Sequence, residues 1–113
     1  MENIIYKELR YRGYTVDVGM VMKRENVNNK DIKKQLEVDF IANLGSKRYY
    51  IQSAHSLPSI EKINQEKASF LNIDDSFKKI IIVKNRINPF LDENGILTIN
   101  LFDFLLNKES LDL

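Results

Sequence analysis

Two carboxylates, Glu37 and Asp39, stand two residues apart in the segment 35–41, where polar and apolar residues alternate. This alternation predicts a β-strand, on which side chains two apart share a face and lie about 7 Å from each other. The opposite face is expected to carry Leu36, Val38 and Phe40. Carboxylate oxygens suit Mg²⁺, which needs only one or two of them beside water or phosphate. The pair is therefore either a weak metal site or the solvated face of an amphipathic strand, and the spacing alone favours the solvated face.

A third acid, Glu8, lies near the apolar positions of the first predicted helix, four residues after Ile4. Two interpretations remain open for it. Its carboxylate points toward the sheet, or it lies at the edge of the apolar stripe and pairs with Arg12, one helical turn later. On the following strand, Gln52 and Ala54 are expected to neighbour the acidic face.

The elements that position these residues follow from hydrophobic periodicity and from turn residues. The predicted order is helix, three strands, helix, two strands, helix: 3–12, 14–24, 35–43, 47–54, 58–72, 79–84, 96–99 and 101–106, with 25–33 as a turn and 87–95 as a loop. Strand 79–84 is apolar throughout, as in a strand buried on both faces, and a right-handed crossover from strand 47–54 makes the two parallel. Asn100 is placed to cap the last helix. The fold class is α/β, three-layered, with helices on a mixed sheet of four or five strands.

Composition narrows the classes of function. Apolar residues make up 43% and charged residues 29% of the 113 residues, as in a single globular domain. Seventeen basic and sixteen acidic residues give a net charge of +1, so binding to nucleic acid or anionic lipid needs a local basic patch. The candidates for such a patch are the doublets Lys33-Lys34, Lys47-Arg48 and Lys78-Lys79. At predicted strand edges and turns, such doublets more often serve solubility and protection against aggregation.

The residue inventory also excludes several sites. The chain has no cysteine, which excludes disulfides and zinc–thiolate sites. The single histidine, His55, is expected at a turn rather than in a metal site. No signal peptide or apolar run long enough for a membrane span is present, so we expect a cytoplasmic protein with no membrane partner.

Taken together, these segments resemble a known family. A helix with an inward Glu, the segment 37–40, the strand 49–54, a helix and a further strand look like the PD-(D/E)XK, or restriction-endonuclease-like, core. More closely, the segments 5–14, 37–40, 50–52 and 99–106 are similar to the domain of unknown function at the C-terminal end of bacterial and archaeal AAA-type ATPases. The likeness covers nearly the whole chain, so residues 1–113 are expected to be one such domain, preceded by an ATPase domain in a longer chain.

The resemblance also implies a degenerate nuclease site. Glu8 and Asp39 match acids of active nucleases, whereas Gln52 stands where a second metal-binding acid belongs and Ala54 where a lysine belongs. An amide lowers the attraction for a hard cation, and loss of the lysine removes a group that steadies phosphoryl-transfer charge. An alternative also remains in which the nuclease site is complete, with Glu37 in place of the missing acid and Lys62 or Lys67 in place of the lysine.

Two functions follow as expectations. The first is a non-catalytic regulatory or interaction domain of an AAA-type ATPase, with no cofactor of its own and with nucleic acid as a candidate partner. The second is a divergent Mg²⁺-dependent nuclease that uses Glu8, Glu37 and Asp39. No glycine-rich phosphate loop occurs in these residues, so ATP binding is not assigned to them.

Overall fold

The computed structural model describes residues 1–54 and 67–113. In chain order its elements are α1 (Glu2–Tyr11), β1 (Thr15–Val27), β2 (Lys30–Leu44), β3 (Lys47–Ala54), a helical turn over residues 67–71, β4 (Lys78–Val83), β5 (Phe90–Leu91), β6 (Leu97–Asn100), α3 (Leu101–Leu106) and the 3-10 helix η1 (Ser110–Asp112). The α/β class is confirmed. None of the helices in this part of the chain has the length and apolar character needed to cross a membrane.

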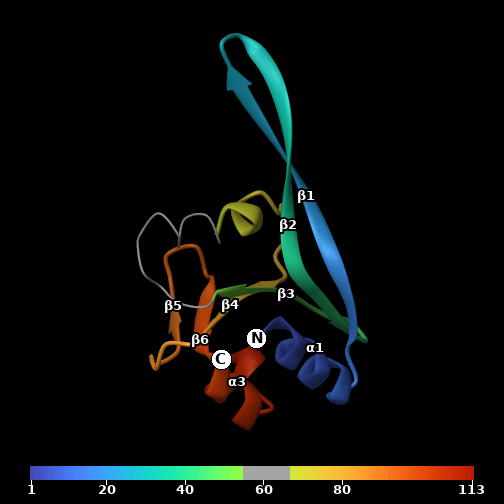
Figure 1. The fold of residues 1–113 in the computed structure, drawn as a ribbon, viewed down its shortest axis with the longest axis vertical. Helices are drawn as coiled ribbons and strands as arrows, with labels where there is room; N and C mark the ends of the chain where they lie inside the picture. The colour runs from blue at the N-terminus through green and yellow to red at the C-terminus, as the bar shows by residue number, and fades with distance from the viewer. Residues whose placement is uncertain (55–66) are drawn as a thin grey trace.

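One mixed sheet of six strands, in the order β1-β2-β3-β4-β6-β5, forms the centre of the fold (Figure 1). The first three strands are an antiparallel meander, and β4 then lies parallel to β3. The predicted parallel pairing of these two strands is confirmed. β6 is parallel to β4, and the short β5 pairs antiparallel with β6. The described residues thus form six strands where four or five were predicted, because β5 lies within the predicted loop 87–95.

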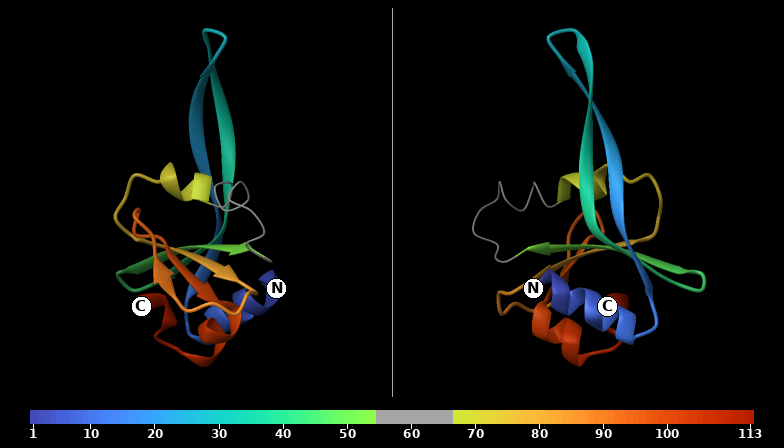
Figure 2. Two further views of the ribbon diagram at one scale, coloured as in Figure 1. Left: turned by 90° about the vertical axis from the view of Figure 1, so that its left-hand side faces the viewer. Right: turned by 45° about the vertical axis from the view of Figure 1, so that its right-hand side comes forward.

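Two apolar clusters lie on opposite faces of the sheet. On one face α1 and α3 lie side by side and contribute Ile5, Leu9 and Phe104, all fully buried (Figure 2). On the other face Phe70, from the helical turn 67–71, packs with Val38 and Ile81. The strand β4 faces both clusters through alternate residues, because Ile80 and Ile82 belong to the first cluster and Ile81 and Val83 to the second. The prediction of a strand buried on both faces is therefore confirmed.

β1 and β2 extend beyond the sheet as a two-stranded arm, residues 19–38, which projects from the body (Figure 1). Nine residue pairs connect its strands, from Gly19 opposite Val38 to Val27 opposite Lys30, a length of roughly 27 Å at about 3.4 Å per step. The turn consists of Asn28 and Asn29 alone, with φ of 54° and 62°. Two consecutive residues with positive φ are typical of a type I′ hairpin turn, and asparagine tolerates this conformation.

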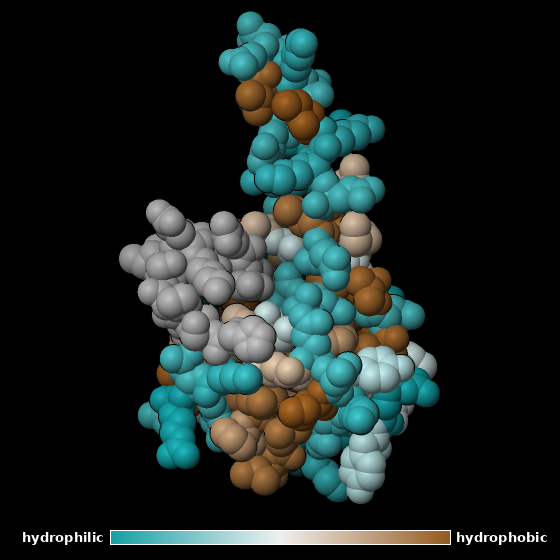
Figure 3. Space-filling model, in the orientation of Figure 1, coloured by the Kyte–Doolittle hydropathy of each residue, from teal (hydrophilic) through white to brown (hydrophobic). Residues whose placement is uncertain are grey.

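This arm corrects one sequence prediction. Residues 25–33 were expected to form a turn, but strand structure continues through all of them except Asn28 and Asn29. The apolar alternation used for the prediction marks strands with one buried face, whereas the upper part of the arm is open to solvent on both faces. Its surface is mainly hydrophilic, with small hydrophobic areas (Figure 3).

A β-bulge lies where the arm leaves the sheet. Asp17 pairs with Ile41 and Gly19 pairs with Val38, so two residues of β2, Asp39 and Phe40, lie opposite one residue of β1. A bulge shifts the alternation of faces by one residue. Consequently Val38 and Phe40 belong to different clusters, and the prediction that they share a face is wrong.

Gly19 is the first paired β1 residue after this bulge and lies opposite Val38. A methyl group on its Cα would lie 2.6 Å from Cδ1 of Ile41 and 3.2 Å from Cβ of Val38. Both distances are shorter than ordinary carbon contacts, which lie near 3.5–4.0 Å. The bulge therefore brings the two β2 side chains over a position where only hydrogen fits without rearrangement.

Candidate functional site

Gln52 is the central residue of the candidate site. It is 4% exposed, and its side chain lies between β3 and the segment of β2 that departs into the arm. Its amide nitrogen donates to the carbonyl oxygen of Glu37 at 2.9 Å, and its amide oxygen accepts from the backbone N–H of Asp39 at 2.8 Å. The regular β2–β3 pairing ends one residue earlier, at Phe40 opposite Ile51. Gln52 thus supplies two hydrogen bonds to β2 backbone that the strand ladder no longer satisfies.

Asp39 is held by the next residue of β3. Its Oδ2 accepts from the backbone N–H of Ser53 at 2.8 Å and from the Ser53 hydroxyl at 3.1 Å. The same hydroxyl lies 3.3 Å from Oε1 of Glu2, at the start of α1. The carboxylate nearest to Asp39 through a hydrogen-bonded neighbour is therefore that of Glu2, a residue that the sequence patterns did not single out.

Glu37 and Ala54 contribute no polar side-chain contact. Glu37 is exposed, and its carboxylate makes no hydrogen bond or ion pair with the described residues; only its backbone carbonyl is used, by Gln52 and by the hydroxyl of Ser69 at 2.9 Å. Ala54 is 4% exposed and lies in the apolar cluster with Phe70. A lysine in its place would have to bring an ammonium group through that cluster, which is costly without a paired charge.

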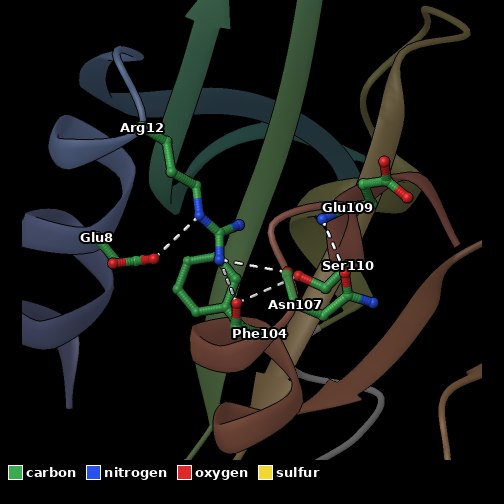
Figure 4. A network of polar contacts seen from close by, with 6 residues as sticks. All are labelled: Glu8, Arg12, Phe104, Asn107, Glu109 and Ser110. Atoms are coloured by element: carbon green, nitrogen blue, oxygen red, sulfur yellow. Dashed lines mark hydrogen bonds and ion pairs between the residues drawn. The ribbon is translucent and has the colours of Figure 1, made fainter.

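Glu8 belongs to a different network, between α1 and α3 (Figure 4). Its carboxylate pairs with Nε of Arg12 at 3.1 Å, so the alternative in which it pairs with Arg12 is confirmed. The Arg12 side chain, 6% exposed, also donates to the carbonyl oxygens of Phe104 and Asn107 and lies 4.7 Å from the centre of the Phe104 ring. Glu8 lies six residues after Glu2, which is about 9 Å along the helix axis. It therefore joins the two helices, and no contact in residues 1–54 and 67–113 links it to Asp39.

Of the two lysines considered as replacements for the missing nuclease lysine, the structure describes only Lys67. Lys67 pairs with Asp92 at 2.6 Å, and both side chains are mostly buried. Burial acts to raise the pKa of Asp92, but the hydrogen bonds from Lys67 and from the backbone N–H groups of Ile96 and Asn94 outweigh it, so the pKa lies below its usual value. Lys67 is thus engaged away from Asp39. Lys62, like His55, lies outside the described residues.

The basic doublets are also used unequally. Lys78 donates to the carbonyl oxygen of the C-terminal residue, Lys79 pairs with Asp75 at 3.4 Å, and Arg48 donates to Asn43 at 2.8 Å. The doublet members whose side chains make no hydrogen bond or ion pair with the described residues are Lys33, Lys34 and Lys47. Two of these three lie on the arm.

The chemistry available to this arrangement is limited. Within the described part of the chain, no three carboxylate or histidine side chains gather as they would around a metal ion. Asp39, Ser53 and Gln52 do meet, but their polar atoms satisfy one another and the β2 backbone. Of the four residues of the expected degenerate site, the contacts join Asp39 to Gln52; Ala54 lies in an apolar cluster and Glu8 in the α1–α3 network.

Sequence reasoning missed Glu2 and Ser53, and for Glu2 the reason is identifiable. The predicted apolar stripe of the first helix rested on Ile4 and Tyr11 as well as Ile5 and Leu9, but Ile4 is 48% and Tyr11 79% exposed. A stripe centred on Ile5 and Leu9 alone places the acid three residues before Ile5, which is Glu2, toward the sheet. That narrower stripe is the signal that could have identified it.

Comparison with known proteins gives one relative and no family. No family model matches the chain. A protein of Haemophilus influenzae, described as an uncharacterized protein, is 33% identical over 106 residues, which cover 94% of this chain and 22% of that protein. The chain therefore spans about a fifth of the length of the relative that it matches.

Proposed function

We propose that this chain is a non-catalytic, restriction-endonuclease-like interaction domain that works as part of a longer AAA-type ATPase. The observation that carries the proposal is the double hydrogen bond of Gln52 to the β2 backbone. An amide can donate to one backbone group and accept from another, whereas an ionised carboxylate can only accept. At the position where a metal-binding acid is expected, Gln52 therefore supplies two backbone hydrogen bonds that an ionised carboxylate could not both make.

The arrangement of elements supports the fold part of the proposal. A first helix, an antiparallel three-strand meander and a crossover to a parallel strand follow one another in the order expected for a restriction-endonuclease-like core. Asp39 lies beside β3, as the resemblance implies, with Ser53 as its direct partner. Ala54, at the expected lysine position, is buried among apolar side chains.

The relation to a longer chain rests on the resemblance and on the H. influenzae relative. About four-fifths of that protein lies outside the aligned segment. We expect that remainder to contain a phosphate-binding loop of the form G-x-x-x-x-G-K-[S/T], because such a loop cradles the ATP phosphates. A remainder without this motif contradicts the ATPase part of the proposal and leaves the description of the domain unaffected.

A cleavage assay tests the non-catalytic part. The purified domain is incubated with plasmid DNA and with RNA in Mg²⁺ or Mn²⁺, beside Asp39→Asn, which keeps a side-chain acceptor for Ser53. We expect no divalent-dependent cleavage in either protein, and no rise in melting temperature with millimolar metal, since a ligand of the folded state stabilises it by mass action. Cleavage by the wild type that Asp39→Asn abolishes overturns the proposal in favour of the Mg²⁺-dependent nuclease.

A further inference from the structure

The arm concentrates the positive charge of the chain. Residues 19–38 include five basic and three acidic residues, a net charge of +2, whereas the rest of the chain has twelve basic and thirteen acidic residues, a net charge of −1. All five basic residues lie between Lys23 and Lys34. The near-neutral total therefore hides a separation of charge between arm and body. Such a local patch is what attraction to a polyanion requires.

The basic side chains are also placed where they cost stability. Lys23 lies directly opposite Lys34, and the next pair is Arg24 opposite Lys33. Like charges directly across two strands are destabilising. One acid compensates in part, because Glu25 pairs with Lys23 at 3.1 Å and its pKa is lowered by the hydrogen bond and the charge of Lys23. Protection of a strand edge needs charged side chains but not like-charged cross-strand pairs, so a partner that neutralises them is the better account.

The two pairs present charge on both faces of the arm. Adjacent residues of a strand point to opposite faces, so Lys23 and Lys34 lie on one face and Arg24 and Lys33 on the other. A flat anionic surface, such as a membrane, contacts one face at a time. A groove with a phosphate backbone on each side contacts both.

The dimensions of the arm fit such a groove. A sheet with its side chains is about 10 Å thick, and the major groove of B-form DNA is about 12 Å wide and admits a two-stranded β-ribbon. The arm is a two-stranded ribbon, because among the described strands β2 pairs with β3 only from Phe40 to Leu44. The major groove of an RNA duplex is deep and narrow and does not admit side chains in this way.

From charge, placement and dimensions we propose that the outer part of the arm, residues 23–34, inserts into the major groove of duplex DNA and contacts the phosphates on both sides. The inference rests on the proposed interaction domain and names its partner. Four basic side chains of the arm form no ion pair with the described residues: Arg24, Lys30, Lys33 and Lys34. The contacts are to backbone phosphate, so binding is expected to depend on salt and hardly on sequence.

The test measures binding of a fluorescein-labelled DNA duplex by anisotropy, in EDTA so that cleavage plays no part. Four phosphate contacts predict a slope of log K against log[salt] of about −3.6, which is a roughly 150-fold loss of affinity between about 50 and 200 mM salt. The double variant Lys33→Gln/Lys34→Gln is expected to have a slope of about −1.8 and a roughly 12-fold loss. The control Lys47→Gln/Lys108→Gln removes the same charge from exposed positions outside the arm and is expected to retain the wild-type slope.

Several results overturn the inference: no salt-dependent DNA binding by the wild type, equal weakening by the arm and control variants, or an RNA duplex competing as well as DNA. Arm-dependent binding to vesicles of anionic lipid without binding to DNA also overturns it, in favour of a membrane surface. The arm variant is expected to melt at or above the wild-type temperature, because it removes like-charge pairs, and a lower melting temperature contradicts that argument. These outcomes are separate from divalent-dependent cleavage, which alone contradicts the non-catalytic proposal.

Discussion

Replacing Gln52 with Glu changes one buried amide into a carboxylate of nearly the same shape. In Gln52→Glu the acceptor for the Asp39 N–H remains, but the donor to the Glu37 carbonyl oxygen is lost. Loss of that hydrogen bond costs about 1 kcal/mol, and burial of an unpaired charge at a position 4% exposed adds about 1–3 kcal/mol. We therefore expect a loss of about 2–4 kcal/mol in unfolding free energy at pH 7, or roughly 8–16 °C in melting temperature.

The same reasoning predicts the direction in which the stability of Gln52→Glu changes with pH. Burial raises the pKa of the introduced carboxyl in the folded state above its unfolded value of about 4.3. The stability of the variant is therefore greatest below the unfolded pKa, where the protonated carboxyl can again donate to the Glu37 carbonyl, and falls as pH rises through the folded pKa. Urea denaturation of the variant and wild type from about pH 3, below the unfolded pKa, to about pH 8 measures this difference.

The control is Gln35→Glu, the same chemical change on the neighbouring strand β2, at an exposed position without a hydrogen bond to the described residues. It is expected to change stability by less than about 0.5 kcal/mol. The structural account of Gln52 is refuted if Gln52→Glu is as stable as Gln35→Glu. A rise in its melting temperature with Mg²⁺ in that case indicates that the position is one substitution away from a metal site.

Three further substitutions test the packing and charges around this region. Gly19→Ala is expected to cost about 1–2 kcal/mol through its contact with Ile41, and an unchanged urea midpoint contradicts that close approach. Lys67→Met is expected to cost about 1–3 kcal/mol at pH 7, because it leaves Asp92 without its cation. The wild type keeps this stability above the unfolded pKa of Asp92, about 3.9, and loses it as pH falls through the lower folded pKa. Urea denaturation of both proteins from neutral to acid pH measures the difference. Tyr49→Phe removes a hydroxyl whose pKa is raised by burial and by its hydrogen bond to a carboxylate of η1. The wild type is therefore expected to lose more stability than the variant as pH rises above about 10, as melting temperatures in alkaline buffer will show.

The sequence predicted best those elements whose side-chain pattern arises from burial. The strand β3 and the helix α3 have the predicted bounds, and Asn100 caps α3 by accepting from the backbone N–H of Phe102 at 2.9 Å. β4 was identified from its apolar run alone. In each case the local pattern and the tertiary contacts agree, which is the condition under which sequence reasoning works.

The strand structure of residues 25–33 and the bulge escaped prediction because neither leaves a pattern of burial. A two-stranded ribbon with both faces in solvent has no apolar face. The only sequence signal for its turn is a pair of asparagines, which also occur in longer loops. The bulge inserts one residue into β2, and nothing in segment 37–41 distinguishes a continuous strand from one that changes faces. The predicted geometry of Leu36, Val38 and Phe40 therefore holds only up to the bulge.

The candidate site and the arm are parts of one structural feature. The arm begins where β2 leaves β3, and at that point the departing backbone is held by the amide of Gln52 and by the hydroxyl of Ser69. These bonds fix the direction of the ribbon relative to the sheet, because the regular ladder has already ended at Phe40. It follows that Gln52→Glu should weaken DNA binding by the arm as well as the stability of the body, and hydrogen exchange of the β2 amides beside the bulge should be faster in that variant. Gln52, the residue that the proposed resemblance aligns with a metal-binding acid, thus holds the backbone at the base of the arm that we propose to bind DNA.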